Sequence, residues 1–290
     1  MIHTISNQAL TVEINTKGAE LWSIKSADNT QYLWQGDPAF WSGRAPILFP
    51  YIGRMTEGRY TYQGKEYEMS IHGFARNSDF VLLDRTESSI TYGLRDYDRT
   101  IYPFPCEFEV SYALDGNQLT TRFTIENKGS DPLYCGIGGH TGYRVPLDEG
   151  LLFEDYYLEF ETTNPPSHPK KFVLSPQCMM TENTVDFPLE EGTKIPLHHG
   201  LFDDDAIVLT EMPRKISLKS DKGSRGVTVS YPDMDYLAIW HNPLKESPFV
   251  CIEPWSSLPS RQDVVEDFES QKNLLKIEKS FQTEIIAEFY

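Results

Sequence analysis

The chain has 290 residues, of which 13% are aromatic and 24% are charged, and its formal net charge is −17 at pH 7. The aromatic content supports a globular core, whereas the strong negative charge argues against nucleic acids and anionic membrane surfaces as partners. The sequence has no apolar run long enough to span a membrane and no signal-peptide pattern at its start. We therefore expect a cytoplasmic protein that does not bind membranes.

The cysteines are scattered and form no C-x-x-C pair, so the sequence predicts neither a zinc site nor a redox pair. Free, buried thiols are the expected state in a cytoplasmic chain. The cysteines are Cys106, Cys135, Cys178 and Cys251.

Alternation of apolar and polar residues, which indicates half-buried strands, recurs along the whole chain. It first appears at residues 10–15, and residues 59–69 form two short runs around a Gln63-Gly64 turn. The strongest signal is a hairpin over residues 106–129, in which two alternating runs flank a turn at residues 115–117. Further strands are predicted at residues 155–162, 206–212, 215–221, 226–232, 236–242, 249–255 and 283–290.

Helical spacing is nearly absent from the sequence. Only residues 260–270, with Val264, Val265 and Phe268, have spacing suited to one or two amphipathic helical turns. We therefore predict an all-β protein with little helix, in which residues 1–290 form one domain with the fold of a large antiparallel β-sandwich. A sandwich of this size can hold a ligand in the concave face of a curved sheet.

The run FVCIEPW at residues 249–255 places a carboxylate among bulky apolar residues. Residues 249–252 are typical of a buried strand, and Glu253 follows at its end. A charge there is costly unless a partner pairs with it or a reaction uses it. Cys251 and Glu253 share one face of the strand, so Glu253 lines a pocket if that face is concave. A salt-bridged glutamate is the alternative.

Two other segments carry cationic or titratable side chains in unusual surroundings. Arg44 and Arg54 flank an apolar segment that contains proline, where one guanidinium is suited to vicinal hydroxyls or to a phosphate. His72 and Arg76 belong to the compact group IHGFAR, in which Gly73 permits a tight turn. Surface arginines and a structural histidine are the alternatives.

The glycine-rich segment GIGGHTGYRVP, residues 136–146, does not match G-x-G-x-x-G, and no amphipathic helix follows it. A dinucleotide site is therefore rejected. We expect Gly138 and Gly139 to let the backbone pass close to a ligand beside His140. An imidazole with a pKa near neutrality suits general acid–base catalysis.

The segment HHGLFDDDAIVL, residues 198–209, places three aspartates before an apolar strand. A solvated acidic loop explains at least one of them, and the spacing does not match an EF-hand calcium loop. One aspartate next to the strand is suited to accept hydrogen bonds from sugar hydroxyls. The sequence has no P-loop, G-x-S-x-G or H-E-x-x-H motif, so NTPase, serine hydrolase and zinc protease functions have no support.

Taken in order, the motifs FPYIGRM, HGFAR, GGHTGY, LFDDDAIVL and CIEPW resemble those of the aldose 1-epimerase (galactose mutarotase) family, and the LacX-type bacterial subgroup is the nearest likeness. The resemblance spans nearly the whole chain. It implies a β-supersandwich fold, which agrees with the strand pattern, and an enzyme that interconverts the α and β anomers of a hexose. Such a reaction needs no metal, nucleotide or redox cofactor.

The resemblance also implies which residues do the chemistry. His140 matches the family's catalytic acid, and Glu253 matches its catalytic base. We therefore expect kcat/KM to follow a bell-shaped pH profile whose acidic limb reports Glu253 and whose basic limb reports His140. Arg54 and His72 match sugar-binding residues. The substrate-binding aspartate falls within residues 203–205, with Asp205 as the first choice and Asp204 as the second.

Several alternatives stay open on the sequence alone. Members of the subgroup more often read Pro-Ala-Phe after the catalytic histidine, whereas this chain has residues 141–143 as Thr-Gly-Tyr, which leaves the preferred sugar open. A hexose-phosphate mutarotase, with Arg44, Arg54 and Arg76 around the phosphate, is one alternative. A glycosidase that pairs Glu253 with an aspartate, and a non-catalytic sugar-binding module, are the others. Monomer and homodimer are both compatible with the sequence.

Overall fold

The computed structural model describes all 290 residues apart from the side chain of residue 182. The described part is built from β-strands, nearly all of them paired antiparallel, and it contains no α-helix. The all-β prediction is therefore confirmed. Short 3-10 segments lie between strands at η1 (Thr56–Gly58), η2 (Ala75–Asn77), η3 (Phe153–Asp155) and η4 (His199–Phe202).

The largest sheet has nine strands within the described residues, and every neighbouring pair is antiparallel. Its central hairpin is the one that the alternating pattern over residues 106–129 predicted, and Gly116 in the connecting turn has φ of +55°. In spatial order the strands are β17 (Lys194–Pro196), β14 (Tyr157–Phe160), β19 (Lys215–Lys219), β20 (Val227–Ser230), β25 (Ser280–Phe289), β10 (Gln118–Asn127), β9 (Cys106–Asp115), β8 (Ser89–Leu94) and β7 (Val81–Arg85).

A second large sheet contains the run FVCIEPW as one of its inner strands. Across the described residues it has eight strands, of which one, β13 (Thr141–Arg144), pairs with β22 beside the main path. The main path runs through β16 (Met180–Asp186), β15 (Lys170–Leu174), β18 (Ile207–Thr210), β21 (Tyr236–Trp240), β22 (Phe249–Trp255), β12 (Gly138–Gly139) and β4 (Ile47–Leu48).

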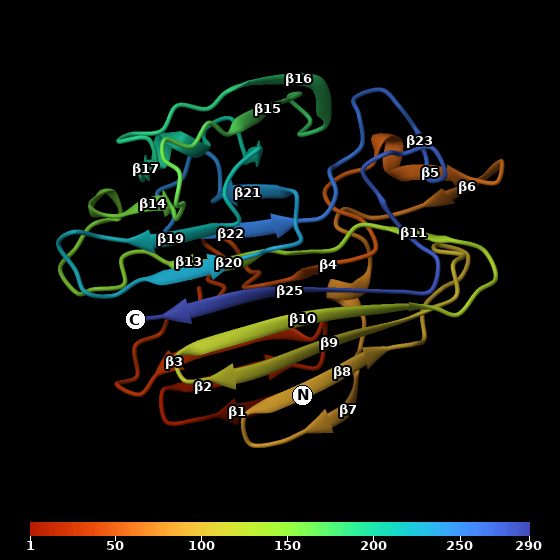
Figure 1. Ribbon diagram of the computed structural model, residues 1–290. Helices are drawn as coiled ribbons and strands as arrows, with labels where there is room; N and C mark the ends of the chain where they lie inside the picture. Colours follow the sequence, from red (N-terminus) through yellow and green to blue (C-terminus); the bar gives the residue numbers. More distant parts are fainter.

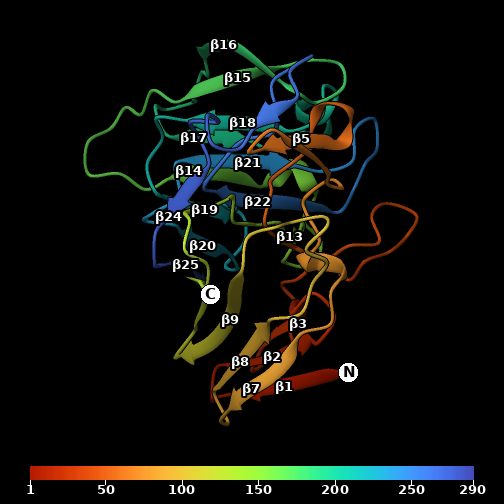
Figure 2. The ribbon, with the colours of Figure 1, turned by 90° about the vertical axis from the view of Figure 1, so that its right-hand side faces the viewer.

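Three small sheets complete the structure that the described residues form. They are β1 (Ile2–Ser6), β2 (Leu10–Asn15) and β3 (Glu20–Ser26); β23 (Glu266–Asp267), β5 (Arg59–Tyr62) and β6 (Lys65–Glu68); and β11 (Leu133–Cys135) with β24 (Leu275–Ile277). Figure 1 shows β25, β10, β9 and β8 side by side. Figure 2 shows β15 and β16 at the opposite end of the molecule from β1 and β7.

The two large sheets share one hydrophobic core. A single cluster of buried residues runs from Ile5 to Phe289. Phe49, directly after β4, stacks on Phe108 of β9 with ring centroids 4.2 Å apart, and Ile252 of β22 belongs to the same cluster. Offset aromatic stacking of this kind adds to the free energy gained by burying apolar area. Among the described residues, no helix has the length and apolar character that crossing a bilayer requires.

The prediction of helical turns within residues 260–270 is wrong. The chain there forms the short strand β23, which pairs parallel with β5. Phe268 is buried and stacks on Tyr60 with ring centroids 3.8 Å apart. The Glu266 carboxylate accepts hydrogen bonds from the backbone and the guanidinium of Arg261. These long-range contacts fix an extended path that the local spacing of apolar residues does not reveal.

A tight turn holds the segment that carries His72. Gly73 has φ of +71°, which glycine adopts without strain, and a Cβ at this position would lie 2.2 Å from the carbonyl oxygen of Phe49. The backbone N–H groups of Phe74 and Ala75 both donate to that oxygen at 3.1 Å. The turn therefore needs glycine for its backbone conformation and for its close contact with the chain after β4.

We predict that Gly73→Ala destabilises the protein by at least about 2 kcal/mol more than Gly64→Ala does, because only Gly73 is crowded. Both glycines have φ close to +70°, at +71° and +72°, so both substitutions meet the same conformational penalty. A Cβ added at Gly64 would have no heavy atom within 4 Å, whereas a Cβ added at Gly73 would meet backbone. Urea unfolding measures both losses, and equal losses for the two variants would contradict the prediction.

Candidate active site

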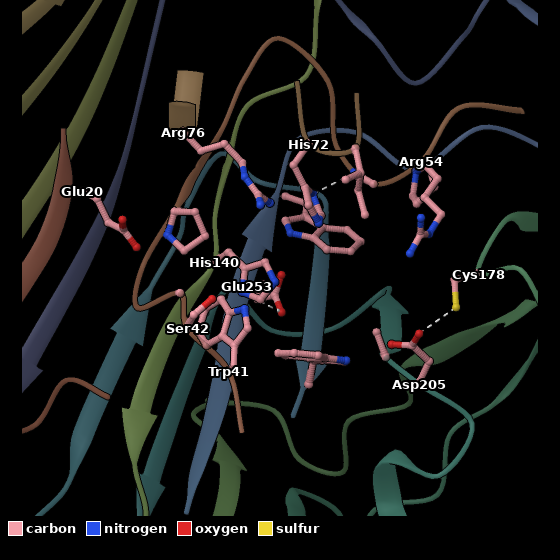
Figure 3. A pocket seen from close by; sticks show the side chains of 18 of the residues that line it. Glu20, Trp41, Ser42, Arg54, His72, Arg76, His140, Cys178, Asp205 and Glu253 are labelled. Atoms are coloured by element: carbon pink, nitrogen blue, oxygen red, sulfur yellow. Dashed lines mark hydrogen bonds and ion pairs between the residues drawn. The ribbon is translucent and has the colours of Figure 1, made fainter. Parts of the chain in front are cut away.

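A cavity of about 650 Å³ opens beside the eight-stranded sheet (Figure 3). Glu253 lines it from β22, Trp240 from β21 and Val208 from β18. Loops that carry Arg54, His72 and other polar residues complete its walls. A concave cavity with a few convergent polar groups is the expected form of a small-molecule site.

Strand β22 carries Glu253 inside the sheet rather than at a strand end. The strand continues to Trp255, and Glu253 lies opposite Ala238 of β21. Ile252 points into the main core, whereas Glu253 and Trp255, on the other face, border the cavity. Glu253 is only 2% exposed, which is rare for a carboxylate without a cationic partner.

His140 approaches Glu253 from the segment between β12 and β13. Its backbone N–H donates to the carbonyl oxygen of Pro46 at 3.2 Å, and its Nδ1 lies 3.4 Å from Oε1 of Glu253. Trp41 stacks on the imidazole with ring centroids 4.9 Å apart, and Trp240 lies nearly perpendicular to it at 5.5 Å. Within the described part of the chain, Nδ1 of His140 has no well-aligned hydrogen-bond partner.

Burial determines the charge of the His140–Glu253 pair. It lowers the pKa of His140 to about 3, and the positive charge of Arg76 acts in the same direction. It raises the pKa of Glu253 well above the usual value, and the negative charge of Asp205 adds to this shift. Both shifts favour the uncharged forms, a neutral imidazole and a protonated carboxyl group, so burial favours a single titratable proton on the pair.

These pKa directions reverse the expected order of the two limbs of the pH profile. The lower pKa belongs to His140, so the acidic limb reports entry of a second proton into the pair. The higher pKa belongs to Glu253, so the basic limb reports loss of the single proton. The sequence-based assignment used ordinary pKa values and did not include the burial of both groups.

His72 has a defined tautomer. Its Nδ1 accepts a hydrogen bond from the backbone N–H of Gly53 at 3.1 Å, and burial lowers its pKa well below 6.5, so the ring is neutral. The single ring proton is therefore on Nε2. The His72 ring lies 5.6 Å from the His140 ring, centroid to centroid. An Nε2–H donor at this place is suited to a sugar hydroxyl or a ring oxygen.

Arg54 and Asp205 lie together on one side of the cavity, at the right of Figure 3. The Arg54 side chain is exposed, and its backbone oxygen accepts a hydrogen bond from Ser260 at 2.9 Å. Asp205 has φ of +76°, and its Oδ2 accepts a hydrogen bond from the Cys178 thiol at 2.7 Å. A guanidinium and a carboxylate on one wall can donate to and accept from neighbouring sugar hydroxyls.

Arg44 lies outside the cavity. Its guanidinium lies 3.8 Å from the centroid of the Trp22 ring, and its Nη1 donates to the Trp22 backbone oxygen at 2.6 Å and to Gln35 Oε1 at 2.8 Å. These contacts attach the segment after residue 40 to β3. We therefore assign Arg44 to structure rather than to substrate binding.

Asp204 and Arg76 were also singled out in the sequence, and only Arg76 borders the cavity. Asp204 is exposed and borders a neighbouring open groove together with Asp203, rather than the cavity that contains Glu253. Arg76 borders the cavity, but Figure 3 shows it and Arg54 on opposite sides of His72. The arginines considered for a phosphate site therefore do not converge on one position.

Gly138 and Gly139 serve strand packing. A Cβ on Gly138 would lie 2.8 Å from the carbonyl oxygen of Pro254, and a Cβ on Gly139 would lie 2.9 Å from Ile285 in the core. Neither glycine borders the cavity. The expectation that they make room for a ligand is wrong. Their small size instead lets β12 pair with both β22 and β4, which fixes the position of His140.

Several residues that border the cavity were not identified from the sequence. Trp41 and Cys178 are two of them. Trp41 stacks on His140, and the Cys178 thiol donates to Asp205, and both partners lie far away in the sequence. Others come mainly from the N-terminal hairpin and include Asn15, Lys17, Glu20, Trp22, Ser42 and Asn77.

One group of side chains in the described residues could offer three metal ligands. His140, Cys251 and Glu253 place one nitrogen, one sulfur and one oxygen within 4.8 Å of one another. Metal binding by cysteine requires the thiolate, and burial raises the pKa of the Cys251 thiol well above its usual value. The group therefore suits proton transfer between His140 and Glu253 better than it suits metal binding.

The chain is similar to proteins of one family along nearly its whole length. The family model described as Aldose 1-epimerase matches residues 1–269. Protein LacX (plasmid) of Lactococcus lactis subsp. lactis is 34% identical over 286 residues, which cover 94% of this chain and 93% of that protein.

Two solved structures share the fold from end to end. A galactose mutarotase related enzyme from Lactobacillus acidophilus has a TM-score of 0.93 and 35% identity, covering 100% of this chain and 97% of that one. A galactose mutarotase-like protein from Lactobacillus casei ATCC 334 has a TM-score of 0.93 and 31% identity, covering 100% of both chains. The sheets therefore form a galactose mutarotase-like fold, as the sequence motifs implied.

The buried Glu253 carboxyl group generates a prediction about stability. Because its folded-state pKa is raised, the folded protein keeps a proton that the unfolded chain releases above a pH of about 4.5, so this group's contribution to stability is lost as pH rises. Glu253→Gln removes the titration. We predict that the variant is more stable than the wild type at neutral pH, by up to about 1.4 kcal/mol for each pH unit between the carboxyl pKa of the unfolded chain and the pH of the measurement.

The gain should vanish near pH 4, where both folded and unfolded wild-type chains hold the proton. Glu266→Gln is a matched control, because Glu266 is equally buried, at 2% exposed, but is paired with Arg261. It should lower stability, since it removes the buried carboxylate that accepts hydrogen bonds from the Arg261 guanidinium. Denaturant unfolding at several pH values gives these differences. A Glu253→Gln variant that is less stable than wild type at neutral pH would show that the carboxyl group is not strained by burial.

Proposed function

The chain belongs to the aldose 1-epimerase family, and on this basis we propose that it interconverts the α and β anomers of a reducing hexose by opening and closing the sugar ring. The observation that carries the proposal is the contact between two buried titratable groups at the cavity wall, with His140 Nδ1 and Glu253 Oε1 3.4 Å apart. Both groups are in reach of one small ligand, and both have pKa values moved away from their ordinary range.

Ring opening requires two proton transfers at neighbouring atoms of the sugar. A base removes the proton from the hydroxyl on C1, an acid protonates the ring oxygen, and the bond between C1 and the ring oxygen breaks to give an open-chain aldehyde. Rotation about the C1–C2 bond then presents the other face of the aldehyde. Closure reverses both proton transfers, and each positioned transfer contributes about 10²- to 10⁴-fold in rate.

The single proton of the pair is the proton that this cycle needs. Burial favours its location on Glu253, because burial disfavours both charged forms. Sugar hydroxyls that donate to Glu253, and a ring oxygen that accepts from His140, favour the ionic form of the pair. We infer that the proton moves to His140 when the sugar binds, which produces the carboxylate base and the imidazolium acid that the family resemblance assigns.

The remaining cavity residues are suited to orient the sugar. His72 offers an Nε2–H donor, Arg54 offers a guanidinium, and Asp205 offers a carboxylate that the Cys178 thiol holds in place. Trp41 and Trp240 form an aromatic wall next to His140, against which the C–H face of a sugar ring can pack. Holding the reacting atoms near the acid and the base accounts for a further part of the rate enhancement.

Anomer exchange of freshly dissolved sugars tests the proposed function directly. Polarimetry or NMR exchange spectroscopy with α-glucose, α-galactose and their 6-phosphates should show faster equilibration with the pure protein than without it. Hydrolysis of aryl glycosides would instead indicate a glycosidase that uses Glu253 and Asp205 as its two carboxylates. Binding without faster exchange would indicate a non-catalytic sugar-binding module.

We predict that Glu253→Gln and His140→Asn each lower kcat for anomer exchange by at least about 100-fold, because an amide can neither take the proton from the C1 hydroxyl nor give one to the ring oxygen. KM should change by less than about tenfold, since both replacements keep a polar side chain of similar size in the site. Arg54→Ala is the comparison variant, and its main effect should be on KM. Retention of more than about a tenth of the wild-type kcat in either catalytic variant would contradict the assigned roles.

We also predict how wild-type activity responds to acid. Because the pKa of His140 is lowered to about 3, the pair keeps its single proton well below the pH at which an ordinary histidine titrates. The value of kcat/KM should therefore stay within about twofold between pH 7 and pH 5. A measured acidic limb with a midpoint near 6.5, the ordinary histidine value, would show that His140 is not desolvated in the free enzyme.

A further inference from the structure

The cavity continues beyond the His140–Glu253 pair into a region that we call the N-terminal arm. It lies on the side of Glu20 and Ser42, away from Arg54 and Asp205 (Figure 3). Ligand cavities of roughly 300–1,000 Å³ hold molecules larger than a single sugar ring, and the whole cavity here measures about 650 Å³. The N-terminal arm is lined by Asn15, Lys17, Glu20, Trp22, Ser42 and Asn77.

Backbone hydrogen bonds make the N-terminal arm rigid. The N–H of Gly18 donates to the oxygen of Ser78 at 2.8 Å, and the N–H of Phe80 donates to the oxygen of Thr16 at 3.0 Å. These bonds join the loop after β2 to the chain after η2. Gly18 has φ of +71°, and a Cβ there would lie 2.8 Å from the backbone oxygen of Arg76. Two segments distant in sequence therefore form one preorganised surface, which reduces the entropy cost of binding.

The side chains of the N-terminal arm match the polar and apolar faces of a sugar ring. Glu20 and Trp22 lie on β3, where Trp22 is an extra residue in the pairing with β2, and both side chains border the cavity. Oε1 of Glu20 accepts the backbone N–H groups of Arg44 and Ala45 at 3.1 and 2.9 Å, which fixes the carboxylate. The Arg44 guanidinium covers one part of Trp22, and the indole also borders the cavity.

We propose that the N-terminal arm binds a second sugar ring, so that the preferred substrate is a reducing disaccharide whose free anomeric carbon lies at the His140–Glu253 pair. This inference rests on the proposed function. Hydroxyl groups can donate to Glu20 and accept from Lys17 at once, and amides such as Asn77 can do both. A phosphate group fits less well, because it has no proton to donate to Glu20 and the negative charge would be repelled.

Anomer exchange at the reducing end tests the proposal. The substrates are maltose, lactose, melibiose and gentiobiose, which cover 1→4 and 1→6 linkages, compared with glucose, galactose and glucose 6-phosphate. Exchange NMR spectroscopy gives kcat/KM for each. We expect at least one disaccharide to exceed its own reducing hexose by about tenfold.

Variants of the N-terminal arm should remove this advantage selectively. Trp22→Ala and Lys17→Ala should each lower kcat/KM for the preferred disaccharide by about fivefold or more, with hexose exchange within about twofold of wild type. Hexose exchange also reports that each variant is folded. Lys25→Ala is the matched control, because Lys25 is an exposed lysine on the same strand as Trp22 and does not border the cavity.

Failure of the second-ring site and failure of the proposed function give different results. If hexoses exchange rapidly but no disaccharide is preferred, or if glucose 6-phosphate is preferred, the second-ring site is wrong and the proposed function stands. The same conclusion follows if the arm variants affect hexose and disaccharide equally. If neither hexoses nor disaccharides exchange faster than in buffer, the proposed function itself is wrong.

Discussion

Removal of His140 and Glu253 from water is the constraint on which the rest of the site depends. An isolated buried charge is very costly, and burial here shifts the pKa values of both groups toward their neutral forms. A pair that carries one proton between a nitrogen and an oxygen 3.4 Å apart can give a proton at one sugar atom and take one at the next. The same desolvation strengthens every electrostatic interaction in the cavity.

The fold supplies this environment through its two large sheets. Strand β22 lies between β21 on one side and β12 with β13 on the other, which fixes the backbone that carries Glu253. Trp41 and Trp240 cover the imidazole of His140. Loops provide most of the polar groups that border the cavity, whereas Glu253 lies on β22 and His140 lies directly between β12 and β13, so the sheet holds both proton-transfer groups in place.

Much of this architecture could be predicted from the sequence, because strand burial is a local signal. Alternating apolar residues in β9 and β10 predicted the hairpin and its turn, and the apolar neighbours of Glu253 along the chain marked that carboxylate as a candidate. Contacts between distant segments could not be predicted in this way. Arg44 stacks on Trp22, a ring 22 residues away on β3, so its sequence neighbourhood suggested a binding role that its position does not support.

The order of the two pKa values could not be predicted either, because it depends on burial that Trp41 and Trp240 complete from separate segments. Nitrogen NMR of the free protein with isotopically labelled histidine tests this central point most directly, with the His140→Asn spectrum used to assign the signals. The account predicts that the His140 ring stays neutral from about pH 8 down to about pH 5, although an ordinary histidine is mostly charged at the lower value. A His140 signal that titrates near 6.5 would contradict a desolvated pair that shares one proton.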